Sequence, residues 1–194
     1  MTPFEFAGGA LSRDELEATL PAVQSAPADG GRLVGIIIRP DRDLRVRADA
    51  CVLTPEEGIP GDRWAKHCNR RLPDGRLNPD TQLTLMNTRF LAPLAGSTER
   101  WPLAGDNLLV DLDLSEANLP VGQHLRVGEA VIEISAEPHT GCAKFAKRFG
   151  NEALSFVNSP EGRRLRLRGV NARVVEAGRI QVGDSITKVD SIPV

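Results

Sequence analysis

A strand pattern gives way to a helix pattern along Pro138-His139-Thr140-Gly141-Cys142-Ala143-Lys144-Phe145-Ala146-Lys147-Arg148-Phe149-Gly150. The preceding residues, 130–136, alternate between apolar and polar side chains, as a strand with one buried face does. Cys142, Phe145 and Phe149 then fall at positions i, i+3 and i+7, which lie on one face of a helix. The pattern therefore predicts a strand-to-helix turn whose helix packs onto a core.

Cys142 is the candidate reactive residue of this turn. If Thr140 or Gly141 is the N-cap, Cys142 lies in the first helical turn, where free N–H groups and the helix dipole stabilise a thiolate. Such a thiolate suits a soft metal or a sulfur atom, and His139 is close enough in sequence to act as its base. The alternatives are that Cys142 is a small buried hydrophobe and that His139 is a solvated loop residue.

Short strand patterns dominate the chain outside this turn. They are expected at 33–38, 44–52, 81–86, 107–112, 123–127, 130–136, 164–175 and 185–189. Many short strands with frequent glycine turns and few helices predict a mainly β fold, a closed or partly open barrel with a few short helices. Within 44–52 the alternation places Cys51 with the polar residues.

The N-terminal part has a different pattern. Residues 12–20 predict a helix, with Ser12 and Glu15 at capping-box spacing, and Pro21 is expected to end it. Residues 21–31 have the composition of a linker. We therefore expect a helical extension and linker over residues 1–30, packed at the periphery, and a barrel domain over residues 31–190.

Composition excludes several classes of function. A net charge of -2 gives no general attraction to nucleic acid or anionic membranes. No apolar run approaches the roughly 20 residues of a membrane span, and residues 1–7 lack the features of a secretory signal. Three widely spaced cysteines and the absence of CxxC and HExxH motifs argue against disulfides and zinc, and for a cytoplasmic protein.

A basic segment, residues 163–173, is the second candidate binding region. If it is extended, Arg164, Arg166 and Arg168 project from one face while the leucines between them face the core. Such a face either meets an anion or is a solvated edge strand. We favour solvation for Arg164 and Arg166, and ligand contact for Arg168, because Gly169 allows close backbone approach.

A long loop, residues 58–80, is the third candidate region. Its glycines allow backbone N–H groups to converge on an oxyanion, and Arg63 adds positive charge, although Asp62 could simply cap a turn. Loops at one rim of a barrel converge on its mouth. We therefore expect one concave site containing Arg63, Asn107, Cys142 and Arg168, with His139 near its edge.

Several blocks in order carry a family resemblance. They are Gly61-Asp62-Arg63, Gly105-Asp106-Asn107-Leu108-Leu109-Val110, Leu119 to Gly128, Cys142-Ala143-Lys144-Phe145, and Arg168 to Val174 with Gly183-Asp184. Together they span about residues 31–189, and the chain resembles the MOSC family, named after the C-terminal domain of molybdenum cofactor sulfurases. The resemblance implies a mostly β, barrel-like fold.

The resemblance also implies a chemistry. It points to a site for the molybdenum cofactor, a molybdopterin, in which Cys142 ligates molybdenum or carries a persulfide. Around that pterin it implies the residues Asp62, Arg63, Asn107, Thr140 and Arg168. Many family members have proline directly before the cysteine, whereas this chain has Thr140-Gly141-Cys142, which alters the turn.

Three functions are compatible with that site. Stand-alone family members are associated with reduction of N-hydroxylated bases, which predicts an oxidoreductase served by a redox partner protein. The alternative is a non-enzymatic carrier of sulfur or cofactor, loaded by a sulfur donor and delivering to a partner enzyme. A third is a ligand-binding barrel without chemistry, which the presence of Cys142 disfavours.

Overall fold

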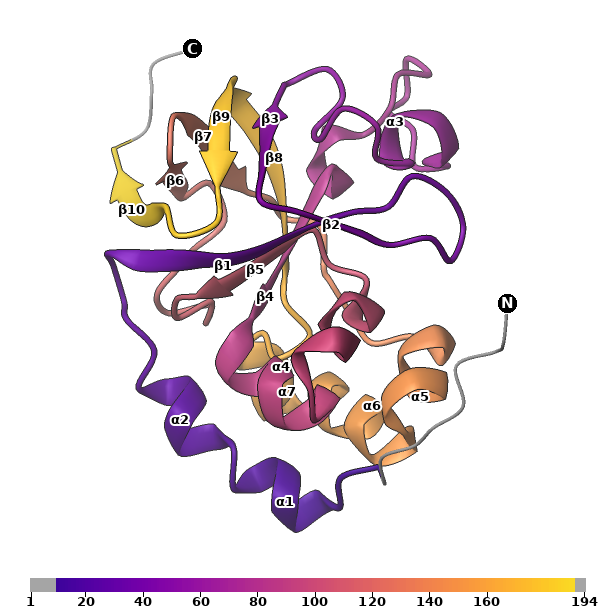
Figure 1. The fold of residues 1–194 in the computed structure, drawn as a ribbon, viewed down its shortest axis with the longest axis vertical. Coiled ribbons are helices and arrows are strands. Elements are labelled where there is room, and N and C mark those ends of the chain that lie inside the picture. The colour runs from indigo at the N-terminus through magenta and orange to yellow at the C-terminus, as the bar shows by residue number, and fades with distance from the viewer. Residues whose placement is uncertain (1–9, 191–194) are drawn as a thin grey trace.

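The chain folds into a barrel of strands with a group of helices packed against one side (Figure 1). The computed structural model describes residues 10–190. In Figure 1 the barrel occupies the upper part of the view and most of the helices the lower part. In the described range no helix is long and apolar enough to span a bilayer.

Seven of the eight strands in the larger sheet close into a barrel. Their order is β1 (Gly31–Ile38), β5 (Leu108–Asp111), β4 (Leu83–Asn87), β8 (Val170–Glu176), β7 (Ala130–Ile134), β6 (His124–Val127) and β10 (Ser185–Val189). Pairing of β10 with β1 closes the ring. The β4–β5 pair is parallel, and its neighbours in the ring are antiparallel. This mixed barrel with short helices confirms the predicted fold class.

Two further strand pairings extend the barrel. Strand β2 (Val46–Ala48) pairs with the end of β1, and β3 (Ala50–Leu53) pairs with β9 (Gly178–Gln181) in a separate two-stranded sheet. Ile180 of β9 is fully buried and belongs to the hydrophobic cluster inside the barrel. The small sheet therefore covers part of the barrel interior.

The helices are short. They are α1 (Arg13–Glu17), α2 (Leu20–Gln24), α3 (Trp64–His67), α4 (Thr88–Ala95), α5 (Ala143–Phe149), α6 (Asn151–Asn158) and α7 (Pro160–Arg164), with 3-10 turns at Pro79–Thr81 and Thr98–Ala104. Asn87 caps α4, since its side chain accepts a hydrogen bond from the Arg89 N–H at 2.7 Å.

Strand alternation builds two hydrophobic cores. Leu85 of β4 and Leu108 of β5 point into the barrel, whereas the next residues, Met86 and Leu109, point outward into a second core. The second core is shared with the helices, including Phe145 and Phe149 of α5, as the sequence pattern predicted. The barrel and helices are thus joined by apolar packing on the outer face of β4 and β5.

The N-terminal helix prediction is wrong in its end point. Pro21 does not end the helical segment, because it occupies the first turn of α2, where its missing N–H costs nothing. Leu16 of α1 and Val23 of α2 are buried in the second core. Residues 1–9 of the predicted extension lie outside the described residues.

The strand expected over 164–175 begins later than predicted. Residues 160–164 form α7, a turn follows, and β8 starts at Val170. Arg164, Arg166 and Arg168 therefore do not share a strand face, although Leu165 and Leu167 are buried as expected. The proline at the first position of α7 and its Ser159 cap favour the helix.

Several side chains in residues 44–52 are exposed where the alternation predicted burial, or buried where it predicted exposure. Leu44, Val46 and Val52 are nearly half exposed, while Cys51 packs against the barrel core opposite Ile180. A bend at Asp49 separates β2 from β3, so one alternation does not run through both strands. Burial raises the pKa of Cys51 to about 11, which makes this thiol inert at neutral pH.

Candidate functional site

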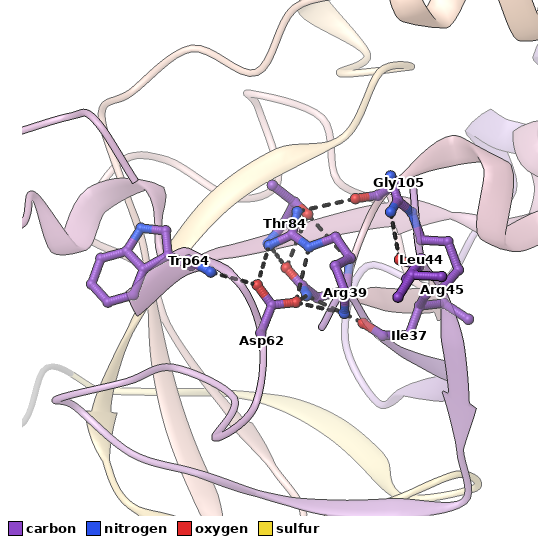
Figure 2. Close-up of polar contacts among 9 residues, drawn as sticks. Ile37, Arg39, Leu44, Arg45, Asp62, Trp64, Thr84 and Gly105 are labelled. Carbon is purple, nitrogen blue, oxygen red and sulfur yellow. Dashed lines mark hydrogen bonds and ion pairs between the residues drawn. The ribbon is translucent and has the colours of Figure 1, made fainter. Parts of the chain in front are cut away.

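A buried carboxylate, Asp62, organises the loop that follows β3 (Figure 2). Asp62 is 3% exposed, and its two oxygens accept hydrogen bonds from Arg39 at 3.0 Å each. It also accepts from the Trp64 N–H and from the Asn107 side-chain amide, both at 3.0 Å. Burial would raise the pKa of Asp62, but the hydrogen bonds and charge of Arg39 lower it. Asp62 therefore stays ionised and fixes the loop to the end of β1.

Asn107 lies behind this carboxylate and is fully buried. Its side chain donates to the Ile37 carbonyl at 3.2 Å and accepts from the Thr84 hydroxyl at 3.3 Å. These bonds join β1, β4 and the start of β5. Asn107 thus supports the wall of the site, and it lines neither of the two cavities described below.

Positive charge collects around Gly105, in a group that we call the arginine cluster: Arg39, Arg45, Arg63 and Arg148. Burial and the charges of the other three arginines lower the pKa of Arg45, and the charge of Asp43 opposes this effect. The Arg39 guanidinium donates to the Gly105 carbonyl at 3.1 Å (Figure 2).

The turn at Gly105 lies against two of these arginines. Gly105 has a φ of 86°, and a Cβ there would lie 3.5 Å from the Arg148 guanidinium and 3.8 Å from that of Arg45. The buried Nε of Arg45 has no hydrogen-bond partner among the described residues. Four guanidinium groups, of which Arg39 is paired with Asp62 and Arg148 approaches Asp43 at 3.5 Å, form a region that attracts an anion.

A cavity of about 390 Å³ opens beside the cluster. Its lining is largely cationic and polar: Arg39, Arg63, Trp64, His67, Cys68, Arg70, Thr81, Thr84, Glu137, Pro138, His139, Thr140 and Asn171. We refer to it as the first cavity. Its size is within the range of small-molecule and cofactor sites.

A second buried carboxylate, Asp106, contacts a histidine and an arginine. Its oxygens lie 2.8 Å from His139 Nε2 and 2.7 Å from an Arg168 terminal nitrogen. The other terminal nitrogen of Arg168 donates to the Ala104 carbonyl at 3.1 Å, and its guanidinium lies 5.2 Å from the centre of the Phe145 ring. Arg168 therefore ties the turn before β8 to helix α5.

Burial and neighbouring charges shift the pKa values within the group of Asp106, His139 and Arg168, which we call the Asp106 triad. Burial raises the pKa of Asp106, but the charges of Arg168 and His139 outweigh it and lower that pKa. Burial and the charge of Arg168 lower the pKa of His139, against the opposing effect of Asp106. At neutral pH the triad therefore holds an ionised aspartate and a neutral imidazole that can accept a proton.

Residues 137–140 separate the first cavity from a second one. The second cavity has a volume of about 310 Å³ and includes Arg163, Arg166, Arg168, Glu116, Val121, Val157, Gly169 and Val170 in its lining. Glu137, Pro138, His139 and Thr140 line both cavities. The segment between β7 and α5 is thus a shared wall, and Glu137 and His139 are its ionisable members.

Cys142 lies at the end of this wall. It is itself the N-cap of α5, whereas Thr140 or Gly141 was the predicted cap, and it is exposed, which excludes the buried-hydrophobe interpretation. Partial burial raises the pKa of Cys142. The N–H groups of Phe145 and Lys144 and the charges of Arg168 and Lys144 lower it by more, so the pKa lies below its ordinary value. The neutral side chain makes no capping hydrogen bond, so this stabilisation acts on the thiolate.

The predicted residues divide between these features. Arg63, His139 and Thr140 line the first cavity, Arg168 lines the second, and His139 and Thr140 belong to both. Asp62 and Asn107 stand in the wall behind Arg39, and Cys142 follows Thr140 by two residues without lining either cavity. The expected single concave site is therefore two cavities sharing one wall.

Sequence reasoning missed four functional candidates: Arg39, Arg45, Arg148 and Asp106. The repeated pair Gly61-Asp62 and Gly105-Asp106 was a usable signal, because each glycine precedes a buried aspartate that binds arginine. The three arginines carried no local signal, since they are brought together only by the fold. Within the described range, no group of three or more His, Cys, Asp or Glu side chains could hold a metal by itself.

Comparisons with known proteins agree with this architecture. The crystal structure of YiiM from Escherichia coli superposes with a TM-score of 0.55 at 21% identity, covering 83% of this chain and 71% of that one. YiiM from Geobacillus stearothermophilus superposes with a TM-score of 0.57 at 16% identity, covering 82% of this chain and 75% of that one. The YuaD protein from Bacillus subtilis superposes with a TM-score of 0.56 at 18% identity, covering 80% of this chain and 93% of that one. At these identities the likeness concerns the fold.

A sequence comparison with curated proteins gives no match. The family model described as MOSC domain matches residues 73–187, more than half of the chain, which includes the Asp106 triad and the Cys142 turn. The chain therefore belongs to the MOSC domain family.

Proposed function

We propose that this protein binds the molybdenum cofactor in the first cavity, with Cys142 as the protein ligand of molybdenum. The observation that carries the proposal is an exposed thiol of lowered pKa, placed two residues beyond the wall of an arginine-lined cavity. A pterin cofactor carries a phosphate, which needs cations, and a soft metal, which needs a thiolate. The donor set therefore fits the group.

The cofactor would be held by this chain's residues in distinct ways. Arg63 lines the first cavity and has no carboxylate partner described, so it can receive the phosphate, while Arg39 is already fixed by Asp62. Thr140 and Thr84 offer hydroxyl groups to polar atoms of the pterin. When bound, the cofactor supplies a metal centre that exchanges electrons with a substrate.

His139 is the residue suited to move a proton beside that centre. Its Nε2 faces Asp106, which fixes the ring and leaves Nδ1 for proton exchange. Conversion of an N–OH group to N–H consumes two electrons and two protons and releases water. On this proposal the electrons come from a redox partner protein. His139 takes up a proton from solvent at Nδ1 and passes it to the leaving oxygen, and the second proton comes from solvent.

A carrier function is the second candidate, and the exposure of Cys142 favours it. A thiolate at the surface can accept sulfur as a persulfide from a donor protein and pass it on. Lys144, next to the thiolate and exposed, would stabilise its negative charge during transfer. The carrier needs no substrate at His139, which distinguishes the two candidates.

The test is to purify the protein from a molybdenum-replete host and to measure bound molybdenum and pterin. We expect both in the wild type, pterin with little molybdenum in Cys142→Ser, and unchanged content in the control Cys51→Ala, because Cys51 lines neither cavity. Absence of pterin from the wild-type protein would contradict cofactor binding. Mass spectrometry showing an added sulfur on Cys142, without pterin, would favour the carrier.

A further inference from the structure

Positive charge is concentrated in one segment beside the first cavity. The whole chain has a net charge of -2, but residues 63–76 contain five cationic side chains and a single carboxylate, that of Asp74. The rest of the chain is therefore more acidic than the whole. We call this segment the cationic loop, and its cations are Arg63, Lys66, Arg70, Arg71 and Arg76.

The fold holds the cationic loop against the first cavity. Arg63, Trp64 and Arg70 line that cavity, and Arg70 approaches Glu137 of the shared wall at 4.0 Å. At the base of the loop, the Trp64 indole N–H donates a hydrogen bond to the Thr81 hydroxyl at 3.1 Å. The loop is therefore part of the rim of the first cavity.

The outer part of the loop is a hydrogen-bonded hairpin. The Leu72 N–H donates to the Arg76 carbonyl at 2.8 Å, and the Asn78 N–H donates to the Arg70 carbonyl at 2.9 Å. The turn closes with a bond of 2.9 Å from the Gly75 N–H to the Leu72 carbonyl. Gly75 has a φ of 85°, which favours glycine at this position. The hairpin thus fixes the spacing of its arginines at the surface.

Two cations of the loop are exposed and not neutralised by a carboxylate. The Lys66 ammonium has no hydrogen bond or ion pair within residues 10–190, and the Arg71 guanidinium donates to a neutral group, the Gly75 carbonyl, at 3.2 Å. Arg76 differs, because it pairs with Asp74 at 2.7 Å. Neither Lys66 nor Arg71 lines the first cavity, so their charges face outward from its rim.

We infer that the cationic loop is the docking surface for an electron-transfer protein that presents carboxylates around its redox group, as small flavin and iron–sulfur carriers do. The inference rests on the proposed function, because reduction of an N–OH group needs two electrons from a partner. Electron-transfer complexes have small interfaces, and complementary charge steers their encounter. A carrier docked on the loop would bring its redox group to the rim of the first cavity.

Nucleic acid is the other polyanion that a cationic surface attracts. Sites for single strands combine cations with aromatic side chains that stack on the bases. The tryptophan of the loop, Trp64, is 7% exposed and its indole N–H is bound to Thr81, so it is not available for stacking. The more acidic remainder of the chain also repels a long polyanion. These observations favour a compact acidic protein.

The test is calorimetric titration of the intact protein at low ionic strength with two acidic carriers, a flavodoxin and a plant-type ferredoxin. We expect saturable binding of at least one, which weakens steeply as the salt concentration rises to about 0.5 M. The double variant Lys66→Gln with Arg71→Gln should bind about fivefold or more weakly, since it removes two charges from the docking surface.

The matched control is Arg32→Gln with Arg164→Gln, which removes the same number of charges. Both residues are exposed, at the start of β1 and in α7, which lie away from α3 in Figure 1. This control should bind as the wild type does. The molybdenum and pterin contents of both double variants should equal those of the wild type, because none of the four residues lines the first cavity.

Three results would overturn the inference. They are no saturable binding of either carrier, equal weakening in the two double variants, and tighter binding of a single-stranded oligonucleotide than of either carrier. Pterin in the wild type without carrier binding would refute the docking surface alone. Absence of pterin from the wild type would refute the proposed function, whatever the carriers do.

Discussion

At the residue scale, the three cysteines occupy three different environments. Cys142 is exposed with a lowered pKa, whereas Cys51 is partly buried against the barrel core with a pKa raised to about 11. Because the thiolate is the nucleophile, we expect iodoacetamide to modify Cys142 first and Cys51 last at mildly acidic to neutral pH. Peptide mapping after brief alkylation measures the order, and faster labelling of Cys51 or Cys68 would contradict it.

The Asp106 triad should give the folded protein a pH dependence in the acid range. The pKa of His139 is lowered from 6.5, so below pH 6.5 the unfolded chain binds a proton that the folded chain does not. Stability contributed by His139 is therefore present above pH 6.5 and is lost as pH falls towards its folded pKa. The lowered pKa of Asp106 has the same sign at more acid pH.

The measurement is urea unfolding of wild type and His139→Gln between pH 5 and pH 8. We expect the wild type to lose stability below about pH 6.5 and the variant to show a flatter profile in that window. Asp106→Asn should cost about 3–5 kcal/mol at pH 7, because it leaves Arg168 buried without its counter-charge. Parallel pH profiles for wild type and His139→Gln would show that His139 does not titrate differently on folding.

At the element scale, the start of β8 depends on a glycine that no other residue can replace. Gly169 has a φ of 97°, and a Cβ there would overlap the carbonyl oxygen of Leu85 in β4 and lie 3.3 Å from the His139 ring. Gly183 has nearly the same φ, 98°, but open space around it. Gly183→Ala should thus cost only the backbone strain, about 1–3 kcal/mol, and Gly169→Ala should cost clearly more.

Chemical unfolding of both variants gives the comparison. Equal losses of stability would contradict this, because they would mean that β4 moves away from the new Cβ at position 169 without a loss of free energy. Gly169 also lines the second cavity, so its substitution should disturb the wall formed by His139.

Elements with strong local signals could be predicted from the sequence, and the others could not. The alternation over residues 130–136 predicted β7 and the apolar run at 33–38 predicted β1, because each signal is local. The 164–175 segment misled because alternating arginine and leucine fit a strand as well as a helix end and turn. The capping signal Ser159-Pro160 decides between them, and it lies before the alternation.

At the scale of the whole molecule, closure of the barrel could be expected from many short strands, but the arrangement of the site could not. Arg39, Arg45 and Arg148 come from three separate parts of the chain and meet at Gly105 only because β1, β5 and α5 pack together. Likewise, the division into two cavities follows from the path of residues 137–140, which carries no periodic pattern. Single residues of the site were therefore predictable, and their grouping was not.

The N-terminal helices test whether the molecule unfolds as one unit. Leu16 of α1 is fully buried in the second core, which also contains Met86 of β4 and Phe156 of α6. Burial of the Leu16 side chain couples the first helix to the barrel. Leu16→Ala should therefore lower the free energy of unfolding by about 2–5 kcal/mol in a single transition. The control Leu44→Ala, at a site that is 46% exposed, should change it by less than about 0.5 kcal/mol. Fluorescence and circular dichroism should report the same midpoint for the wild type, because the helices and the barrel share apolar contacts on β4 and β5. If instead Leu16→Ala left the main transition unchanged and added a separate early one, residues 13–24 would be an appendage that folds independently of the barrel.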